Sequence, residues 1–419
     1  MRNVFKASFS EFLSVLSLLS LCSVLVLSGC DTDNTPAPKA LTPLISSGNS
    51  NFKLTQVWSR SLTQGSEKKY VTLGPVLDQD SGKLITADYR GEVVLVDVNT
   101  HKILWDVKTH EFLGGTPSVS NQQVYLGTLD GKLIALDESS GKTLWQAKLS
   151  SSLLASPVGV SGGVNGQASG MVLAYTHDGN LTAFSSLDGH QLWQYLGDPL
   201  PNLIMAGEAN PVIVGSNVVI GTHSGQLLSL SLSNGQVNWQ RPIAIPSGGT
   251  DISQMVDVVG NPVFDSAGNG VLYAVTYHGN LVAIDPVDGS LLWEHPLSSL
   301  KALALSPSAA GNAVIATNDQ GDVLAFDRDT GRELWNQSGF EYRFTTAPAL
   351  LNTGLNNTGN SVVIVGDYQG YIHCLDLKNG QEIARVKMGS HIIAAAPVVF
   401  NQNVYLTDEM GKVVVYKIN

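Results

Sequence analysis

Among the residues that could form a catalytic or metal-binding site, histidines beside turn glycines have the most suggestive spacing. The chain has nine histidines, and His177, His223 and His278 each stand one or two residues before a turn glycine in successive copies of a repeat. Equivalent positions of a closed repeat surround one axis, so three imidazoles could converge on a metal ion. The flanking residues differ, however, and no Cys or Glu stands at a matching position. We therefore interpret these histidines as polar turn residues rather than ligands.

Other patterns that carry chemistry are few. The sequence contains neither a P-loop nor a Gly-x-Gly-x-x-Gly motif after a strand. Of the three cysteines, Cys374 lies on an apolar strand, where we expect a buried core residue without a disulfide partner. A pair of carboxylates contributed by different repeats stays open, because the sequence does not place such residues relative to one another.

The histidines and the other candidate residues are positioned by a repeat of forty-odd residues. It is marked by glycines 40 to 54 residues apart, at Gly91, Gly131, Gly179, Gly225, Gly279, Gly321, Gly370 and Gly411. Around each glycine, apolar runs alternate with Gly- and Asp-containing turns, as expected for short antiparallel strands. Such a period is typical of propeller blades. The sequence therefore predicts an all-β fold, an eight-bladed β-propeller with four antiparallel strands per blade.

Residues that recur in every copy are interpreted as scaffold. A tryptophan recurs on the outer strand, at Trp105, Trp145, Trp193, Trp239, Trp293 and Trp335, with Ala384 at this place in the seventh copy. A large aromatic side chain at a fixed position fills space between blades, and we prefer this interpretation to an aromatic ligand cage. Aspartates recur in the last turn of the blade, at Asp97, Asp137, Asp285, Asp327 and Asp376, where we expect them to cap the turn.

The eighth copy lacks its outer strand, because the chain ends after Lys412–Tyr416 and a few further residues. The run from Phe52 to Trp58 belongs to no copy, and Trp58 matches the tryptophan that is missing. We predict that residues 52–62 complete blade eight and close the ring, which removes open sheet edges. The propeller domain is therefore expected to span 52–419.

The N-terminus has the pattern of a lipoprotein signal. Arg2 and Lys6 precede an apolar stretch that ends in Leu-Ser-Gly before Cys30. We predict a signal peptide over 1–29, with Cys30 as the lipidated first residue of the mature chain; the alternative is an ordinary signal peptide that happens to contain Cys30. Residues 30–51 are polar and proline-rich, and we expect a flexible tether.

Charge and composition restrict the classes of partner that the protein is expected to bind. The formal net charge is −11, and 14% of the residues are charged. An acidic chain without a Lys/Arg cluster argues against binding to nucleic acid and against a polybasic contact with lipid headgroups.

Two connections between blades are unusually long and belong to neighbouring positions on the ring. Residues 196–210 join blades three and four, and residues 241–261 join blades four and five. The first carries consecutive apolar residues, Leu203, Ile204 and Met205; the second contributes Ile252, Met255, Val256 and Asp257. A cluster of exposed apolar side chains is typical of a protein contact. The alternative is that residues 203–205 fold down and plug the ring.

The unit Val124–Asp137, followed by Gly141-Lys142-x-Leu144-Trp145, resembles the PQQ-like repeat. With the lipoprotein signal, the tether and eight blades, the whole chain resembles the BamB family of the outer-membrane β-barrel assembly machine. The stretches Leu203–Pro211 and Asp251–Pro262 look especially similar.

In that family, the two matching loops bind a periplasmic POTRA domain of BamA. Carried over residue by residue, the resemblance implies that Leu203 and Met205 are apolar contacts and that Asp257 is an acidic one. Two positions depart from the family pattern: Ala206 stands where an Arg is usual, and Val259 where a second Asp is usual. Part of the polar contact is therefore in question.

The resemblance implies a non-enzymatic scaffold without a cofactor or metal. Its implied partners are BamA, other subunits of the machine and nascent outer-membrane β-barrel proteins, and its location is the periplasmic face of the outer membrane through the lipid anchor. Asp31 resembles a signal for retention in the inner membrane. The alternatives are a periplasmic PQQ-dependent quinoprotein dehydrogenase, although the chain has no vicinal Cys-Cys pair, and a propeller that binds another ligand.

Overall fold

The computed structural model describes residues 36–42, 52–67, 69, 71–162, 170–205, 207–268, 270–306, 311–352 and 361–418. The chain divides into two compact units, Met1–Ala37 and Pro38–Asn419, and all the strands belong to the second. The predicted signal peptide 1–29 and Cys30 lie outside the described residues and stay predictions. Within the described residues, we find no helix with the length and apolarity that crossing a membrane requires.

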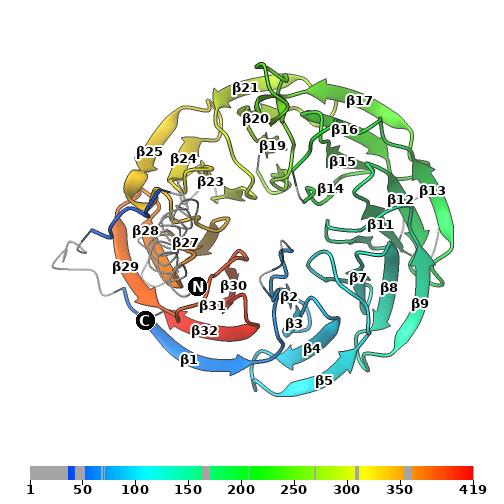
Figure 1. The fold of residues 1–419 in the computed structure, drawn as a ribbon, viewed down its shortest axis with the longest axis horizontal. Helices are drawn as coiled ribbons and strands as arrows, with labels where there is room; N and C mark the ends of the chain where they lie inside the picture. Colours follow the sequence, from blue (N-terminus) through cyan, green and yellow to red (C-terminus); the bar gives the residue numbers. More distant parts are fainter. Residues whose placement is uncertain are drawn as a thin grey trace, which may run out of the picture. The chain divides into compact units, whose positions relative to one another are not determined.

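Eight four-stranded antiparallel sheets are arranged as the blades of a ring (Figure 1). In blades one to seven, strands follow one another in chain order from the axis outward. Blades one to four consist of β2 (Val76–Asp78), β3 (Lys83–Ala87), β4 (Glu92–Asp97), β5 (Ile103–Lys108), β6 (Ser118–Ser120), β7 (Gln123–Gly127), β8 (Lys132–Asp137), β9 (Thr143–Lys148), β10 (Val158–Val160), β11 (Met171–Tyr175), β12 (Leu181–Ser185), β13 (Gln191–Tyr195), β14 (Val212–Val214), β15 (Asn217–Gly221), β16 (Gln226–Ser231) and β17 (Val237–Pro242).

Blades five to eight follow the same plan, and 3-10 helices occur in the connections that the structure describes. They consist of β18 (Val263–Phe264), β19 (Leu272–Val275), β20 (Asn280–Ile284), β21 (Leu291–Pro296), β22 (Ala304–Leu305), β23 (Ala313–Thr317), β24 (Val323–Asp327), β25 (Glu333–Gln337), β26 (Ala349–Asn352), β27 (Ser361–Gly366), β28 (Tyr371–Asp376), β29 (Glu382–Lys387), β30 (Val398–Phe400), β31 (Asn403–Thr407), β32 (Lys412–Ile418) and β1 (Leu54–Ser61), with η2 (Ile252–Gln254) and η4 (Ser338–Phe340).

The ring is closed by the N-terminal strand. Blade eight has the order β1-β32-β31-β30, and β1 pairs with β32 antiparallel from Leu54↔Ile418 to Ser61↔Lys412. The predicted completion of blade eight by residues 52–62 is confirmed. Trp58 also fills the place expected of it: its ring stacks on His101 of blade one, with centroids 5.0 Å apart.

Neighbouring blades are joined by a repeated contact between tryptophan and glycine. Six outer-strand indoles donate their N–H to a backbone carbonyl of the following blade at 2.7–3.0 Å. Trp193, for example, donates to the carbonyl of Leu232, and a Cβ on Gly235 (φ 71°) would lie 2.5 Å from its ring. The recurring tryptophans are therefore scaffold, and each needs both the space and the positive φ that a turn glycine supplies.

The core lies between the blades. The second and third strands of each blade are almost wholly buried, as in β7 and β8, because each sheet packs on a neighbour through both faces. Cys374 is fully buried among these strands, and burial raises the pKa of its thiol, so it is a core residue as predicted. The recurring aspartates cap their turns: Asp137 Oδ1 accepts the backbone N–H of Ser140 at 2.8 Å.

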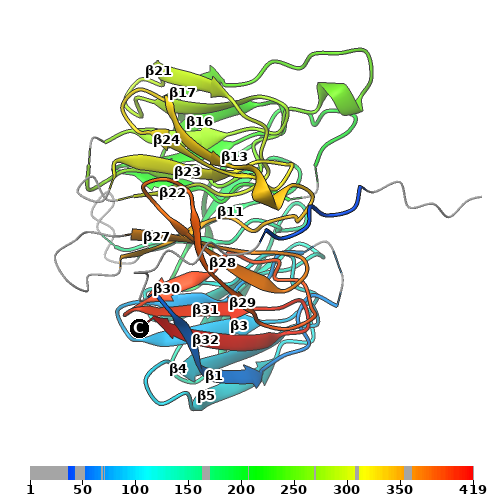
Figure 2. The same cartoon turned by 90° about the vertical axis from the view of Figure 1, so that its left-hand side faces the viewer.

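Part of the predicted tether, 30–51, lies against the ring. The Arg343 guanidinium donates to the carbonyl of Lys39 at 3.1 Å, and Arg385 donates to the carbonyl of Thr42 at 3.1 Å. Contacts with the propeller therefore begin well before β1. In the edge-on view of Figure 2, this blue segment lies on the same side of the ring as the green connection after β17.

Candidate functional site

The two long connections lie side by side and are tied to each other and to the blades beneath. The backbone N–H of Asn210 donates to Asn261 Oδ1 at 2.7 Å, and Asn210 Oδ1 accepts the N–H of Ser156 at 2.7 Å. Val258 N–H donates to the carbonyl of Thr222 at 3.1 Å. The two connections are thus bonded to each other, to Ser156 before blade three and to Thr222 of blade four.

The apolar residues of the first connection stay at the surface. Leu203 is 43% exposed, and Ile204 and Met205 are half-buried. Leu200 and Ile252 of the same face are also exposed. These side chains do not plug the ring, which was the alternative interpretation. Ala206 lies outside the described residues.

Asp257 differs from the sequence-based picture of a surface contact because it is buried. Its side chain is 0% exposed, and Met255 and Val256 are buried as well, so these three residues lie beneath the apolar surface rather than within it. Asp257 Oδ1 accepts the backbone N–H of Met205 at 3.2 Å and lies 2.7 Å from Nδ1 of His223. The carboxylate therefore supports the loop from below.

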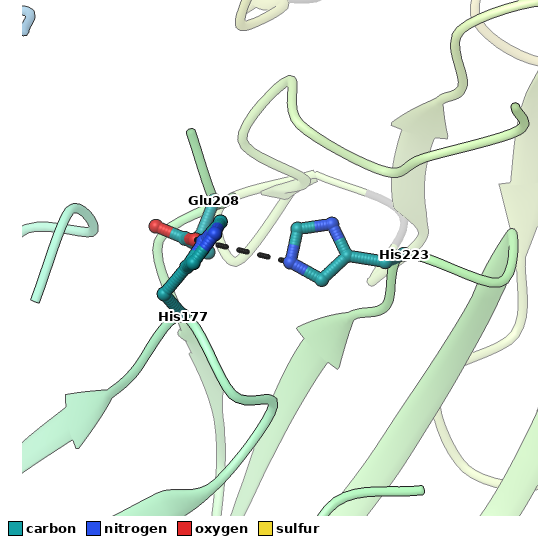
Figure 3. A group of neighbouring side chains, drawn as sticks. All are labelled: His177, Glu208 and His223. Carbon is teal, nitrogen blue, oxygen red and sulfur yellow. Dashed lines mark hydrogen bonds and ion pairs between the residues drawn. The ribbon is translucent and has the colours of Figure 1, made fainter. Parts of the chain in front are cut away.

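A group of three side chains lies under the same loop (Figure 3). His177 follows β11, His223 follows β15, and Glu208 comes from the connection between these blades. His177 Nδ1 contacts Glu208 Oε1, and His223 Nε2 lies 3.8 Å from the same oxygen. One ligand atom from each residue lies within 4.8 Å of the other two, a spacing that brings a metal ion within reach. The interpretation of His177 and His223 as turn residues without ligand character is therefore incomplete.

Charge and burial shift the pKa values of two side chains in this region. The contact with Glu208 raises the pKa of the His177 imidazole, although partial burial opposes this shift. Burial also raises the pKa of the nearby Tyr175 hydroxyl, with a further contribution from the charge of Glu208. The side chains of Glu208 and His223 are 1% and 5% exposed, whereas His177 is 32% exposed and forms the open side of the group.

Sequence reasoning missed Glu208. Glu208 stands on a connection between blades, outside the repeated positions that are equivalent to those of the histidines. One signal was available: His177 and His223 each stand two residues before the turn glycine of adjacent blades, and residues 196–210 join these two blades. His278, the third histidine, does not join the group and instead stacks on Tyr277.

A cavity of about 410 Å³ opens on the inner side of Glu208. Small residues such as Gly74, Gly114 and Ala395 line much of it, and Lys301 adds a positive charge opposite in sign to Glu208. Burial lowers the pKa of the Lys301 amine. Glu208 thus stands between this cavity and the two histidines.

The closed ring and the repeated tryptophan contacts define an eight-bladed β-propeller of PQQ-like repeats. The family model described as outer membrane protein assembly factor BamB matches residues 55–162, 89–337 and 319–419. The chain belongs to this family.

Individual relatives agree with this assignment. The chain is 29% identical over 406 residues to the outer membrane protein assembly factor BamB of Yersinia pestis, covering 94% of this chain and 97% of that one. The crystal structure of BamB from Moraxella catarrhalis superposes with a TM-score of 0.73 at 29% identity, over 87% of this chain and 100% of that chain. A quinohemoprotein alcohol dehydrogenase from Comamonas testosteroni shares the fold at 13% identity, with a TM-score of 0.65 over 87% of this chain and 76% of that chain.

Proposed function

We propose that this protein is a non-enzymatic scaffold lipoprotein of the outer-membrane protein assembly complex. In this role it binds a POTRA domain of BamA, meets other subunits of the complex and assists the folding and insertion of β-barrel proteins. Membership of the BamB family supports the general role. The observation that carries the specific contact is an exposed Leu203 on a loop whose backbone is held from beneath by the buried Asp257.

The binding surface consists of Leu203, Ile204 and Met205. An apolar side chain that is already partly desolvated and fixed in position loses little conformational freedom when a partner covers it. Such residues are the usual anchors of an interface. Asp257 acts as a positioning residue in this proposal, because its carboxylate is buried and reaches the surface only through Met205.

The lipid anchor is part of the same proposal. Acyl chains on Cys30 would hold the protein at the periplasmic face of the outer membrane, since two or more chains anchor a protein stably. Asp31 makes the inner membrane the competing location. Fractionation of the membranes, with an Asp31→Ser variant beside the natural chain, distinguishes the two.

The test is binding of the full mature chain to purified BamA POTRA domains. We expect Leu203→Arg to weaken binding at least tenfold, because the guanidinium would be placed in a desolvated contact. Leu187→Arg is the matched control, since Leu187 is 73% exposed in the last turn of blade three, on the opposite face. The proposal fails if the natural chain does not bind, or if Leu203→Arg and Leu187→Arg bind alike.

A further inference from the structure

We propose that His177, Glu208 and His223 bind a divalent transition-metal ion of the zinc class. The three side chains come from two adjacent blades and from the connection between them, and they converge on one point (Figure 3). Glu208 Oε1 contacts His177 Nδ1 and lies 3.8 Å from His223 Nε2. An ion here would join the turns of two adjacent blades to the connection between them.

Two buried atoms of the group lack a hydrogen-bond partner among the residues that the structure describes. These atoms are Glu208 Oε2 and His223 Nε2. Their side chains are 1% and 5% exposed, so both atoms lie in a site that excludes most water. A buried polar atom without a hydrogen bond is costly, and in native proteins such an atom needs an explanation. Coordination of a cation satisfies both atoms.

The surroundings of His223 favour its role as a ligand. Its Nδ1 lies 2.7 Å from Asp257 Oδ1, a carboxylate that can only accept, so Nδ1 carries the proton. With that proton on Nδ1, Nε2 is the nitrogen left to bind a cation beside Glu208. A carboxylate that holds the far nitrogen of an imidazole in this way is the usual outer support of a metal-bound histidine.

The donor set selects the kind of ion. Two imidazole nitrogens and one carboxylate oxygen suit Zn²⁺ and its neighbours, whereas Mg²⁺ and Ca²⁺ prefer oxygen ligands throughout. Zinc sits about 2.0–2.2 Å from such atoms. The half-exposed side of His177 allows the ring to move into that geometry.

Space for a fourth ligand lies beside His223. A narrow pocket of about 30 Å³ is lined by His223 together with Tyr175, Asp198 and Leu200. That volume is sufficient to hold a water molecule. Three protein ligands with a water in the fourth position is a common arrangement for zinc.

Calorimetric titration of ZnCl₂ into the untagged full chain tests the proposal. We expect one ion per chain. His223→Ala and Glu208→Gln should weaken binding at least a hundredfold, and Asp257→Asn about 10- to 100-fold, because the supporting carboxylate is lost. His278→Ala is the matched control, since it lies in the corresponding turn of blade five and should bind like the natural chain.

Cobalt provides a second measurement that does not depend on stability. Co²⁺ bound by two imidazoles and a carboxylate gives visible absorption bands, which should disappear in His177→Ala, a change on the open side of the group that leaves the core intact. Failure of the natural chain to bind one ion, or equal binding by His177→Ala, His223→Ala and His278→Ala, overturns the proposal. The two histidines would then be ion-pair partners of Glu208 and Asp257 only.

Discussion

The carboxylate of Asp257 accepts the backbone N–H of Met205 at 3.2 Å and thereby connects an apolar surface to a buried charged group. The same oxygen lies 2.7 Å from Nδ1 of His223. Asp257 is buried and does not reach a partner itself, yet one of its bonds holds the loop that a partner would meet and the other ties that loop to His223 of blade four.

Replacing Asp257 by Asn is therefore expected to destabilise the propeller. Asn offers a neutral acceptor to His223 and Met205 in place of a charged one, and hydrogen bonds to buried charged groups contribute about 1.5–3 kcal/mol. We expect a loss of that order in the free energy of unfolding, measured with urea. Asp188→Asn is the control, because Asp188 pairs with His190 at the surface, where solvent screens the ion pair and little stability depends on it. Equal losses in the two variants would contradict a supporting role for Asp257.

The contact between turn glycines and tryptophans gives a second prediction. Gly235→Ala places a Cβ 2.5 Å from the ring of Trp193 at a φ of 71°, whereas Gly215 has a φ of 60° and nothing within 4 Å of its added Cβ. Both variants should lose about 1–2 kcal/mol from the left-handed backbone. Only Gly235→Ala should lose a further ~1–3 kcal/mol, because it overpacks the junction between blades. Urea midpoints of the pair measure the difference, and identical midpoints would show that the glycine serves the turn alone.

Much of the fold could be predicted from the sequence, because its signals are local and repeated. Turn glycines, alternating apolar runs and the unpaired Trp58 each constrain neighbouring residues, and eight copies reinforce one another. The hydrogen bond from each indole to the next blade could not be predicted, since it depends on how two blades pack.

The candidate site was only partly predictable, for a related reason. Loop length and apolar content selected the region around Leu203, because neither depends on tertiary structure. Burial of Asp257 depends on how its connection folds back on Thr222, and the meeting of Glu208 with His177 and His223 depends on the angle between blades. Contacts of this kind leave no periodic pattern in a sequence.

A network of buried charges links the ring to the N-terminal segment and gives a prediction about pH. Asp367 contacts Arg343 at 2.6 Å and His373 at 3.2 Å, and Glu382 contacts His373 at 2.7 Å. Burial alone would raise the pKa of both carboxyls, but their bonds to His373 and the arginines outweigh it and lower both pKa values. A carboxyl whose pKa is lowered by folding stabilises the protein at pH values above its pKa in the unfolded chain, about 4. This contribution is lost as the pH falls through the pKa of the same carboxyl in the folded protein.

Glu382→Gln should therefore lower the free energy of unfolding at pH 7, and the difference from the natural chain should shrink as the pH falls toward 3. Urea titrations across this range measure the convergence. Glu333→Gln is the matched control, because Glu333 is the exposed first residue of β25, as Glu382 is the first of β29. A difference that stays constant with pH would mean that Glu382 acts through packing rather than charge.

The same network predicts how firmly residues 39–42 are held. Arg385 donates to the carbonyl of Thr42, and removal of its guanidinium in Arg385→Ala leaves Glu382 paired with His373. The segment should then detach more often, so that trypsin cleaves after Lys39 several-fold faster, because proteolysis follows the population of the open form. Mass spectrometry of the N-terminal product gives the rate. Arg332→Ala, which removes an exposed arginine from the last turn of blade six, should leave it unchanged. If Arg385→Ala is cleaved no faster than Arg332→Ala, the bond to Thr42 does not hold the segment on the ring.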